Sequence, residues 1–224
     1  MLIIMETIKN KYELGCSQCS DINEHLSTLY KYANECNSVF ETGVRGCVSS
    51  WALTYGLLTN TNNIPKYILF NDINECNIQE LLNATSTENI TTEYIWKSNL
   101  LLELDKTYDL TFIDTWHIYG QLKRELEKFS KTTNKYIIMH DTTVDEWIGE
   151  TIRCGWDAVG QSVVSGFPVE EINKGLWPAI EEFLQSNPEW ILHERFTNNN
   201  GLTILKKYKQ TLHFLKTETI MVKN

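Results

Sequence analysis

The stretch over residues 38–58, SVFETGVRGCVSSWALTYGLL, constrains the fold more than any other part of the chain. It opens with a short apolar run that is typical of the end of a buried strand, and a glycine-bearing turn follows. Residues 49–58 then carry apolar side chains at three- and four-residue spacing, which predicts a helix. A strand, a glycine turn and a helix form the first half of an α/β nucleotide-binding unit, because glycine lets the backbone approach a ligand and a helix start offers unpaired N–H groups.

The acidic residue Glu41, at the predicted strand end, limits which cofactor this turn can hold. Gly43 and Gly46 are present, but the dinucleotide pattern G-x-G-x-x-G is not, because position 41 is Glu and no glycine occupies positions 47–55. A carboxylate here would repel a pyrophosphate and could hold a cation. The turn therefore argues against NAD and fits a cofactor with a positive, amino-acid-like end, such as S-adenosylmethionine.

The rest of the chain alternates between short apolar segments and amphipathic segments. Further strands are predicted over residues 66–70, 92–96, 108–113 and 136–139. Helices are predicted over residues 21–36, 79–84, 120–131 and 176–185. Two final strands, 190–196 and 201–207, are joined by TNNN, which is typical of a hairpin. This order predicts an α/β fold with a mostly parallel sheet covered by helices on both faces.

Two segments depart from that rhythm. Residues 1–20 carry little periodic signal, so we expect an irregular N-terminal arm. Residues 142–176 contain glycine and tryptophan but only moderate helical signal, and they directly follow the fifth strand, so this segment is a candidate substrate lid. No linker or repeat divides the chain, and one domain over residues 1–224 is expected.

Composition restricts the partners and the compartment. A net charge of −9 argues against nucleic acid as a partner, because phosphate contacts need clustered Lys and Arg. The sequence has no apolar run long enough for a membrane span, and its first residues lack the basic region and cleavage site of a signal peptide, so neither feature is expected. The six cysteines are scattered, which favours free thiols in a reducing cytoplasm over a disulfide or zinc framework. Small molecules are the expected partners, and a homo-oligomer is compatible with the chain.

Polar side chains follow each of the five predicted parallel strands. Since ligands of open α/β sheets bind at the carboxyl ends of the strands, these residues are expected to converge on one site. The strand-end residues are Glu41, Asp72, Ser98 with Asn99, Asp114, and His140 with Asp141.

With these motifs in place, residues 21–207 resemble the class I S-adenosylmethionine-dependent methyltransferases. The segment FIDTWH is similar to F-L-D-H-W-K of catechol O-methyltransferase, and IIMHDTT is similar to the later strand of that enzyme, which ends in Asp-Asn. VFETGVRGCVSSW followed by FIDTWHIYGQLKREL also resembles the cephalosporin hydroxylase and macrolide sugar O-methyltransferase group, in which D-x-x-H recurs. The resemblance implies a Rossmann-like, seven-stranded sheet that closes with an antiparallel C-terminal hairpin.

The resemblance also implies roles for individual residues. The cofactor residues would be Glu41 and Gly43 at the methionine end, Asp72 at the ribose hydroxyls, and Ser98, Asn99 and Trp116 around the adenine, together with Gly46, Ser49 and Asp114. Asp114 and Asp141 would be oxygen ligands of Mg²⁺. Because His117 takes the place of the catalytic lysine of the catechol enzyme, it would act with these two carboxylates as a general base.

The sequence departs from the family pattern at the turn and at the metal. The family often has glycine at the position of Cys47, whereas this chain has Gly46. Asp141 is followed by Thr142 and preceded by His140, so the third metal ligand stays open, and a metal-free site is the alternative. His140 is a weaker catalytic candidate than His117.

The function expected from these residues is methyl transfer from S-adenosylmethionine to a hydroxyl of a small molecule. The macrolide-sugar resemblance favours a sugar hydroxyl, on a nucleotide-linked or surface-glycan precursor. Two alternatives remain: a metal-dependent hydroxylase of the cephalosporin type, in which the two carboxylates and His117 hold iron, and a non-catalytic protein that only binds the cofactor.

Overall fold

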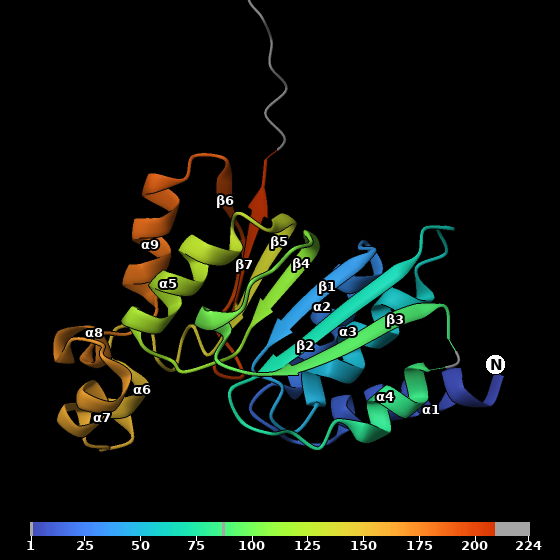
Figure 1. Cartoon of the computed structure of the whole chain (residues 1–224), viewed down its shortest axis with the longest axis horizontal. Helices are drawn as coiled ribbons and strands as arrows, with labels where there is room; N and C mark the ends of the chain where they lie inside the picture. The colour runs from blue at the N-terminus through green and yellow to red at the C-terminus, as the bar shows by residue number, and fades with distance from the viewer. Residues whose placement is uncertain (1, 87, 209–224) are drawn as a thin grey trace, which may run out of the picture.

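The computed structural model describes residues 2–86 and 88–208, and within them seven strands form one sheet in the order β3-β2-β1-β4-β5-β7-β6 (Figure 1). The strands are β1 (Ser38–Thr42), β2 (Lys66–Asp72), β3 (Ile90–Trp96), β4 (Tyr108–Ile113), β5 (Thr133–His140), β6 (Trp190–Phe196) and β7 (Leu202–Lys207). Strands β1 to β5 pair in parallel, and β7 pairs antiparallel with both β5 and β6. The expected sheet with a C-terminal antiparallel hairpin is confirmed.

Helices cover both faces of this sheet. They are α1 (Leu2–Ser17), α2 (Leu26–Asn34), α3 (Val48–Thr59), α4 (Gln79–Thr85), α5 (Tyr119–Phe129), α6 (Glu150–Arg153), α7 (Ala158–Ser165), α8 (Val169–Asn173) and α9 (Trp177–Ser186), with short 3-10 turns at Asn23–His25 and Asn99–Leu101. Figure 1 shows α1 to α4 on one side of the sheet and α5 and α9 on the other. Among the described residues, no helix is both long and apolar enough to cross a lipid bilayer.

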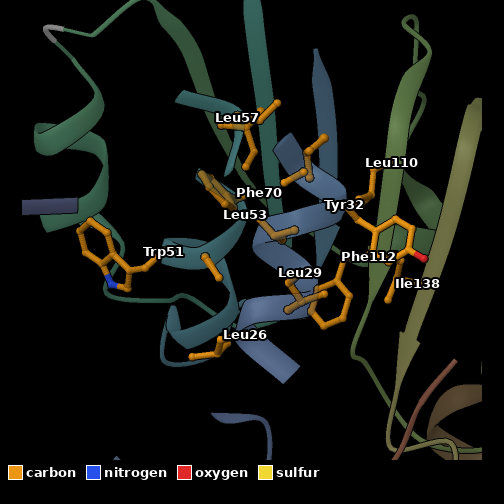
Figure 2. Packing of buried hydrophobic residues seen from close by; sticks show 14 of the residues in the cluster. Leu26, Leu29, Tyr32, Trp51, Leu53, Leu57, Phe70, Leu110, Phe112 and Ile138 are labelled. Atoms are coloured by element: carbon orange, nitrogen blue, oxygen red, sulfur yellow. The ribbon is translucent and has the colours of Figure 1, made fainter. Parts of the chain in front are cut away.

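The core consists of two apolar clusters, one on each face of the sheet. Successive side chains of β1 point to opposite faces of the sheet and so belong to different clusters. Val39 belongs to the cluster beneath α2 and α3, and Phe40 belongs to the cluster beneath α5 and α9. Phe40 packs edge-on against Phe129 with ring centroids 5.0 Å apart. Figure 2 shows the first cluster, in which Leu29 and Leu53 from the two helices meet Phe112 from the sheet. A strand buried on both faces can place its carboxyl end accurately.

The first 20 residues differ from the expected irregular arm, because Leu2–Ser17 form the helix α1. Ile8 is fully buried, and one turn later the ring of Tyr12 lies 5.3 Å from the rings of both Tyr30 and Tyr55. Charged residues interrupt this narrow apolar stripe, so the sequence carries little helical period. The helix is therefore held by packing on α3 rather than by strong amphipathicity.

Residues 142–176 are also more regular than their sequence predicts. They contain the three short helices α6, α7 and α8, and no residue of α7 is buried. The predicted helix over 120–131 is confirmed as α5, and its buried face includes an acid, Glu125, which is fully buried.

Candidate functional site

A cavity of about 490 Å³ opens at the carboxyl ends of the parallel strands, where ligands of such sheets bind. Most of the sequence-predicted residues line it: Gly43, Gly46, Ser49, Asp72, Ser98, Asn99, Asp114, Trp116 and His117. Other lining residues were not singled out in the sequence, among them Arg45, Ile73, Asn74, Glu75, Gln121 and Glu150. The volume is in the range of small-molecule and cofactor sites.

Asp72 holds the turn that follows β1. Its Oδ2 accepts hydrogen bonds from the backbone N–H groups of Val44 and Arg45 at 2.9 and 3.0 Å, and its Oδ1 accepts one from Asn74 N at 2.8 Å. The carboxylate expected at the ribose therefore also fixes the loop that forms the cavity wall. In the same loop Cys47 has a φ of 62°, which is a left-handed backbone conformation that glycine adopts easily. This is the position at which the resembling family often has glycine.

Glu41 does not line the cavity, which corrects its expected position at the methionine end. It is fully buried on the α3 side of β1, and Ser49 Oγ donates a hydrogen bond to its Oε1. Burial raises the pKa of Glu41 to about 8, and the hydroxyl bond from Ser49 acts in the opposite direction. The reason for the error is the alternation of strand side chains, which directs residue 41 away from the face used by its neighbour Thr42.

Asn99 lies between the cavity and a buried polar network. Its Nδ2 donates to Thr42 Oγ1 at 2.9 Å and to Glu125 Oε1 at 2.5 Å. Thr115 and Gln121 also donate to Glu125 Oε1, each at 2.7 Å. Burial raises the pKa of Glu125 to about 7 despite these three bonds. The network ties the end of β1, the turn after β3, the loop after β4 and α5 together beneath the site.

Trp116 separates the main cavity from a second cavity of about 580 Å³. Its ring stacks on Phe167 at a centroid distance of 5.9 Å, and its Nε1 donates to Thr151 Oγ1 at 3.2 Å. The second cavity is lined by Ile73, Trp116, Trp156, Asp157, Gly160, Gln161, Val164 and Ser165. Trp116 therefore lines both cavities and also contacts Thr151 and Phe167 of the segment predicted as a lid.

Asp114, His117 and Asp141 come together as the sequence predicts. His117 Nε2 lies 3.3 Å from Asp114 Oδ1 and 3.1 Å from Asp141 Oδ2. His140 approaches the same two oxygens from the opposite, buried side, with Nδ1 at 3.4 and 3.2 Å. Strands β4 and β5 are neighbours in the sheet, which is why their carboxyl ends place two carboxylates and two imidazoles side by side.

Two further acids complete this cluster and were missed in the sequence. Asp145 Oδ2 lies 3.3 Å from His117 Nδ1, and Glu150 Oε2 lies 3.7 Å from the same atom. Asp145 is fully buried and paired with Arg153, which donates from Nε at 2.5 Å and from Nη2 at 2.9 Å. The four-residue offset from Asp141 to Asp145, one helical turn, is the signal that could have identified it.

The carboxylates set the protonation of both histidines in the ion-free protein. Burial disfavours the charged imidazole of His140, but Asp114 and Asp141 outweigh it and raise its pKa to about 10. Burial also lowers the pKa of His117, but hydrogen bonds with Asp114 and Asp145 outweigh it and raise this pKa well above its ordinary value. In return the two imidazoles outweigh burial at Asp114 and hold its pKa below the usual range. Without a cation, the carboxylates therefore favour the protonated form of both histidines.

The donor set fits a divalent cation. The nitrogen and oxygen atoms of Asp114, His140 and Asp141 lie within 4.8 Å of one another, and so do those of His117, Asp141 and Asp145. Carboxylate oxygens and imidazole nitrogens are ordinary ligands of divalent metals. A cation would also relieve the repulsion between acids that approach this closely.

No protein-family model and no curated protein sequence matches the chain. Several solved structures do match its fold. An O-methyltransferase from Bacillus cereus in complex with SAH has a TM-score of 0.57 and 13% identity, and the match covers 90% of each chain. A putative caffeoyl-CoA O-methyltransferase from Staphylococcus aureus has a TM-score of 0.54 and 18% identity over 91% of each chain. The SAH-bound Podospora anserina methyltransferase PaMTH1 has a TM-score of 0.54 and 13% identity, covering 90% of this chain and 88% of that one.

These likenesses extend over nearly the whole of both chains at low identity. They agree with the strand order and with the antiparallel C-terminal pair described above. The chain therefore has the Rossmann-like fold of the class I methyltransferases.

Proposed function

We propose that this protein is an S-adenosylmethionine-dependent O-methyltransferase. The observation that carries the proposal is the convergence of Asp72, Asp114 and His117 on one cavity at the carboxyl ends of β2 and β4. The fold supports it, since the similar solved structures are methyltransferases, and two of them contain bound SAH. Asp72 lies at the end of β2, where its carboxylate can accept hydrogen bonds from the ribose hydroxyls.

In this proposal the protein acts mainly by alignment. Methyl transfer is a direct displacement at a sulfonium carbon, so the acceptor oxygen, the methyl group and the sulfur must lie in line. His117 lines the cavity and faces both carboxylates, so it is the group placed to take the proton of the acceptor hydroxyl. A divalent cation at Asp114 and Asp141 would lower the pKa of that hydroxyl and offset the negative charge that otherwise keeps His117 protonated.

For the acceptor we propose a sugar hydroxyl, on a nucleotide-linked or glycan precursor. The second cavity supports this choice through the rings of Trp116 and Trp156, on which the C–H face of a sugar could stack. In this arrangement α7 would contact the acceptor, while the deeper cavity would hold the cofactor.

The test is binding and turnover of the full chain. Calorimetry with S-adenosylmethionine measures cofactor affinity, and transfer of a labelled methyl group is measured with sugars, nucleotide sugars and catechols in parallel. His117→Ala should lower turnover about 10²–10⁴-fold and leave cofactor affinity nearly unchanged, because the imidazole acts on the acceptor proton. His193→Ala is the matched control, since His193 is exposed and outside the site.

Each result selects one function. Binding without transfer to any acceptor class would favour a non-catalytic binding protein, and hydroxylation of an acceptor by iron-loaded protein would favour the hydroxylase. Full turnover of the His117 variant would remove this residue from the mechanism. Transfer to catechols but not to sugars would overturn the acceptor assignment alone.

A further inference from the structure

His140 is held in one orientation by two backbone carbonyls. Its side chain is buried, with the residue 2% exposed, and its Nε2 lies 3.0 Å from Asp21 O and 3.3 Å from Asn199 O. A carbonyl oxygen only accepts hydrogen bonds, so Nε2 carries a hydrogen. In the neutral imidazole the lone pair therefore resides on Nδ1.

That Nδ1 atom is aimed at two carboxylates and makes no hydrogen bond among the described residues. Asp141 Oδ2 lies 3.2 Å away and Asp114 Oδ1 lies 3.4 Å away. A lone pair that faces two negative oxygens is repulsive, so Nδ1 needs either a proton or a metal ion between it and the carboxylates. Metal-binding histidines have this arrangement, because they donate the second ring N–H to a carbonyl or carboxylate and present the other nitrogen to the ion.

The distances from His140 Nδ1 to the two carboxylate oxygens fit ligands that share one ion. With metal–ligand bonds of about 2.1 Å, neighbouring ligands lie about 3.0 Å apart in an octahedron and about 3.4 Å apart in a tetrahedron. The separations from His140 Nδ1 to the two carboxylate oxygens, 3.2 and 3.4 Å, fall between these values. His140 does not line the cavity, whereas His117 does, so His140 approaches from the buried side and leaves the cavity side for the acceptor.

We propose that His140 Nδ1 is the third protein ligand, with Asp114 and Asp141, of a divalent transition-metal ion, and that the site prefers such an ion over Mg²⁺. Imidazole nitrogen suits Zn²⁺, Fe²⁺ and related ions, whereas Mg²⁺ is held by oxygen ligands and keeps its waters. The assignment deepens the proposed function, on which it rests for the role of the ion at the acceptor. Asp145 is left out of the set because Arg153 already pairs with it.

The experiment is metal binding to the full chain, stripped with chelator and dialysed, with neither cofactor nor acceptor present. Calorimetric titrations with Co²⁺ and with Mg²⁺ are compared for wild type, His140→Gln and His193→Gln. The amide nitrogen of glutamine can still donate to the carbonyls of Asp21 and Asn199, so His140→Gln removes Nδ1 with little other change. His193→Gln controls for the loss of a histidine outside the site.

We expect wild type to bind Co²⁺ at least about 10-fold more tightly than Mg²⁺. His140→Gln should lose roughly 10–100-fold in Co²⁺ affinity and change less than about 3-fold for Mg²⁺, and His193→Gln should match wild type. Should His140→Gln fail to fold, pulsed EPR of the Mn²⁺-loaded His117→Ala protein should still show coupling to a histidine nitrogen.

Three results would overturn the proposal and leave His140 as an imidazolium paired with the carboxylates. They are equal Co²⁺ affinity in wild type and His140→Gln, tighter binding of Mg²⁺ than of Co²⁺, and the absence of nitrogen coupling in the EPR spectrum. The readouts do not depend on methyl transfer. If the protein binds Co²⁺ through His140 but has no transferase activity, the proposed function is refuted and the metal site stands. If it has transferase activity but does not bind Co²⁺ through His140, the metal site is refuted and the proposed function stands.

Discussion

The backbone oxygen of Asp114 lies 1.8 Å from the position that a Cβ atom on Gly43 would occupy. Gly43 also has a φ of 92°, which side-chain-bearing residues rarely adopt. The two residues belong to neighbouring strand ends, and Asp114 N donates a hydrogen bond to Thr42 O at 2.9 Å. The turn that would hold the cofactor and the carboxylate that would hold the ion are therefore positioned by one close backbone contact.

Gly43→Ala should destabilise the protein by at least about 2 kcal/mol, because the new methyl group meets a backbone atom and the backbone is strained. Gly46→Ala is the matched control, since a Cβ at Gly46 meets nothing within 4 Å and its φ is not positive. Urea unfolding of both variants measures the difference. Equal stabilities would show that the turn can move away from Asp114 without cost.

Asp72→Ala should weaken binding of S-adenosylmethionine by about 1–3 kcal/mol, the usual effect of removing hydrogen bonds to a charged group. The change also removes the acceptor for the N–H groups of Val44 and Arg45. Glu75→Ala, at another acid that lines the cavity, is the control. Calorimetry checks the prediction, and an affinity equal to wild type would exclude Asp72 from the cofactor site.

Glu125 should make the stability of the protein depend on pH. Burial raises its pKa from the ordinary 4.5 to about 7, so between these values the folded state holds a proton that the unfolded state has lost. The contribution of Glu125 to stability is therefore complete below about pH 4.5 and lost as the pH rises to about 7, with a slope of up to about 1.4 kcal/mol per pH unit.

Glu125→Gln should remove this contribution and leave a smaller slope, because the amide does not titrate while Glu41, whose pKa burial also raises, still does. Glu127→Gln, at an exposed position of the same helix, should keep the full slope of wild type. The measurement is the free energy of unfolding in urea at pH 5 and at pH 7.5 for the three proteins. A slope in Glu125→Gln identical to that of wild type would mean that the buried carboxyl does not titrate in this range.

Helix α7 should exchange its amide hydrogens at least about 10-fold faster than α9, because none of its residues is buried, whereas Ala179, Ile180 and Phe183 of α9 are. If residues 142–176 close over the acceptor, exchange in α7 should slow when cofactor and acceptor are both bound. Mass spectrometry with and without ligands tests this. Exchange as slow in free α7 as in the central strands would argue against a lid.

The strands and their carboxyl ends could be predicted from the sequence because buried parallel strands are continuous apolar runs that stop at polar residues. Residues 108–113 match β4, and residues 190–196 match β6. The proximity of Asp114, His117 and Asp141 could be predicted in the same way, because these residues lie at or just after the ends of β4 and β5, which are neighbours in the sheet. What the pattern could not supply was the face of each side chain, and this is why Glu41 was expected in the cavity.

Other features depend on contacts between segments that are distant in the sequence. Glu125 is polar on a helix whose exposed side is charged. Its burial is made tolerable by three donors, which come from the loop after β4, from α5 and from the turn after β3. The helix α1 owes its order to packing on α3. Asp145 stands in a segment with weak periodicity, and its role depends on His117 and Arg153, which no local pattern links to it.

The two carbonyls that orient His140 come from opposite ends of the chain. Asp21 precedes it by 119 residues, and Asn199, in the turn between β6 and β7, follows it by 59. During synthesis the strands that carry Asp114 and Asp141 are complete well before Asn199 is added. A chain that lacks its last hairpin would therefore present two carboxylates and an imidazole held by the Asp21 carbonyl alone. An ion that needs all three side chains would be bound fully only after the final strands have docked.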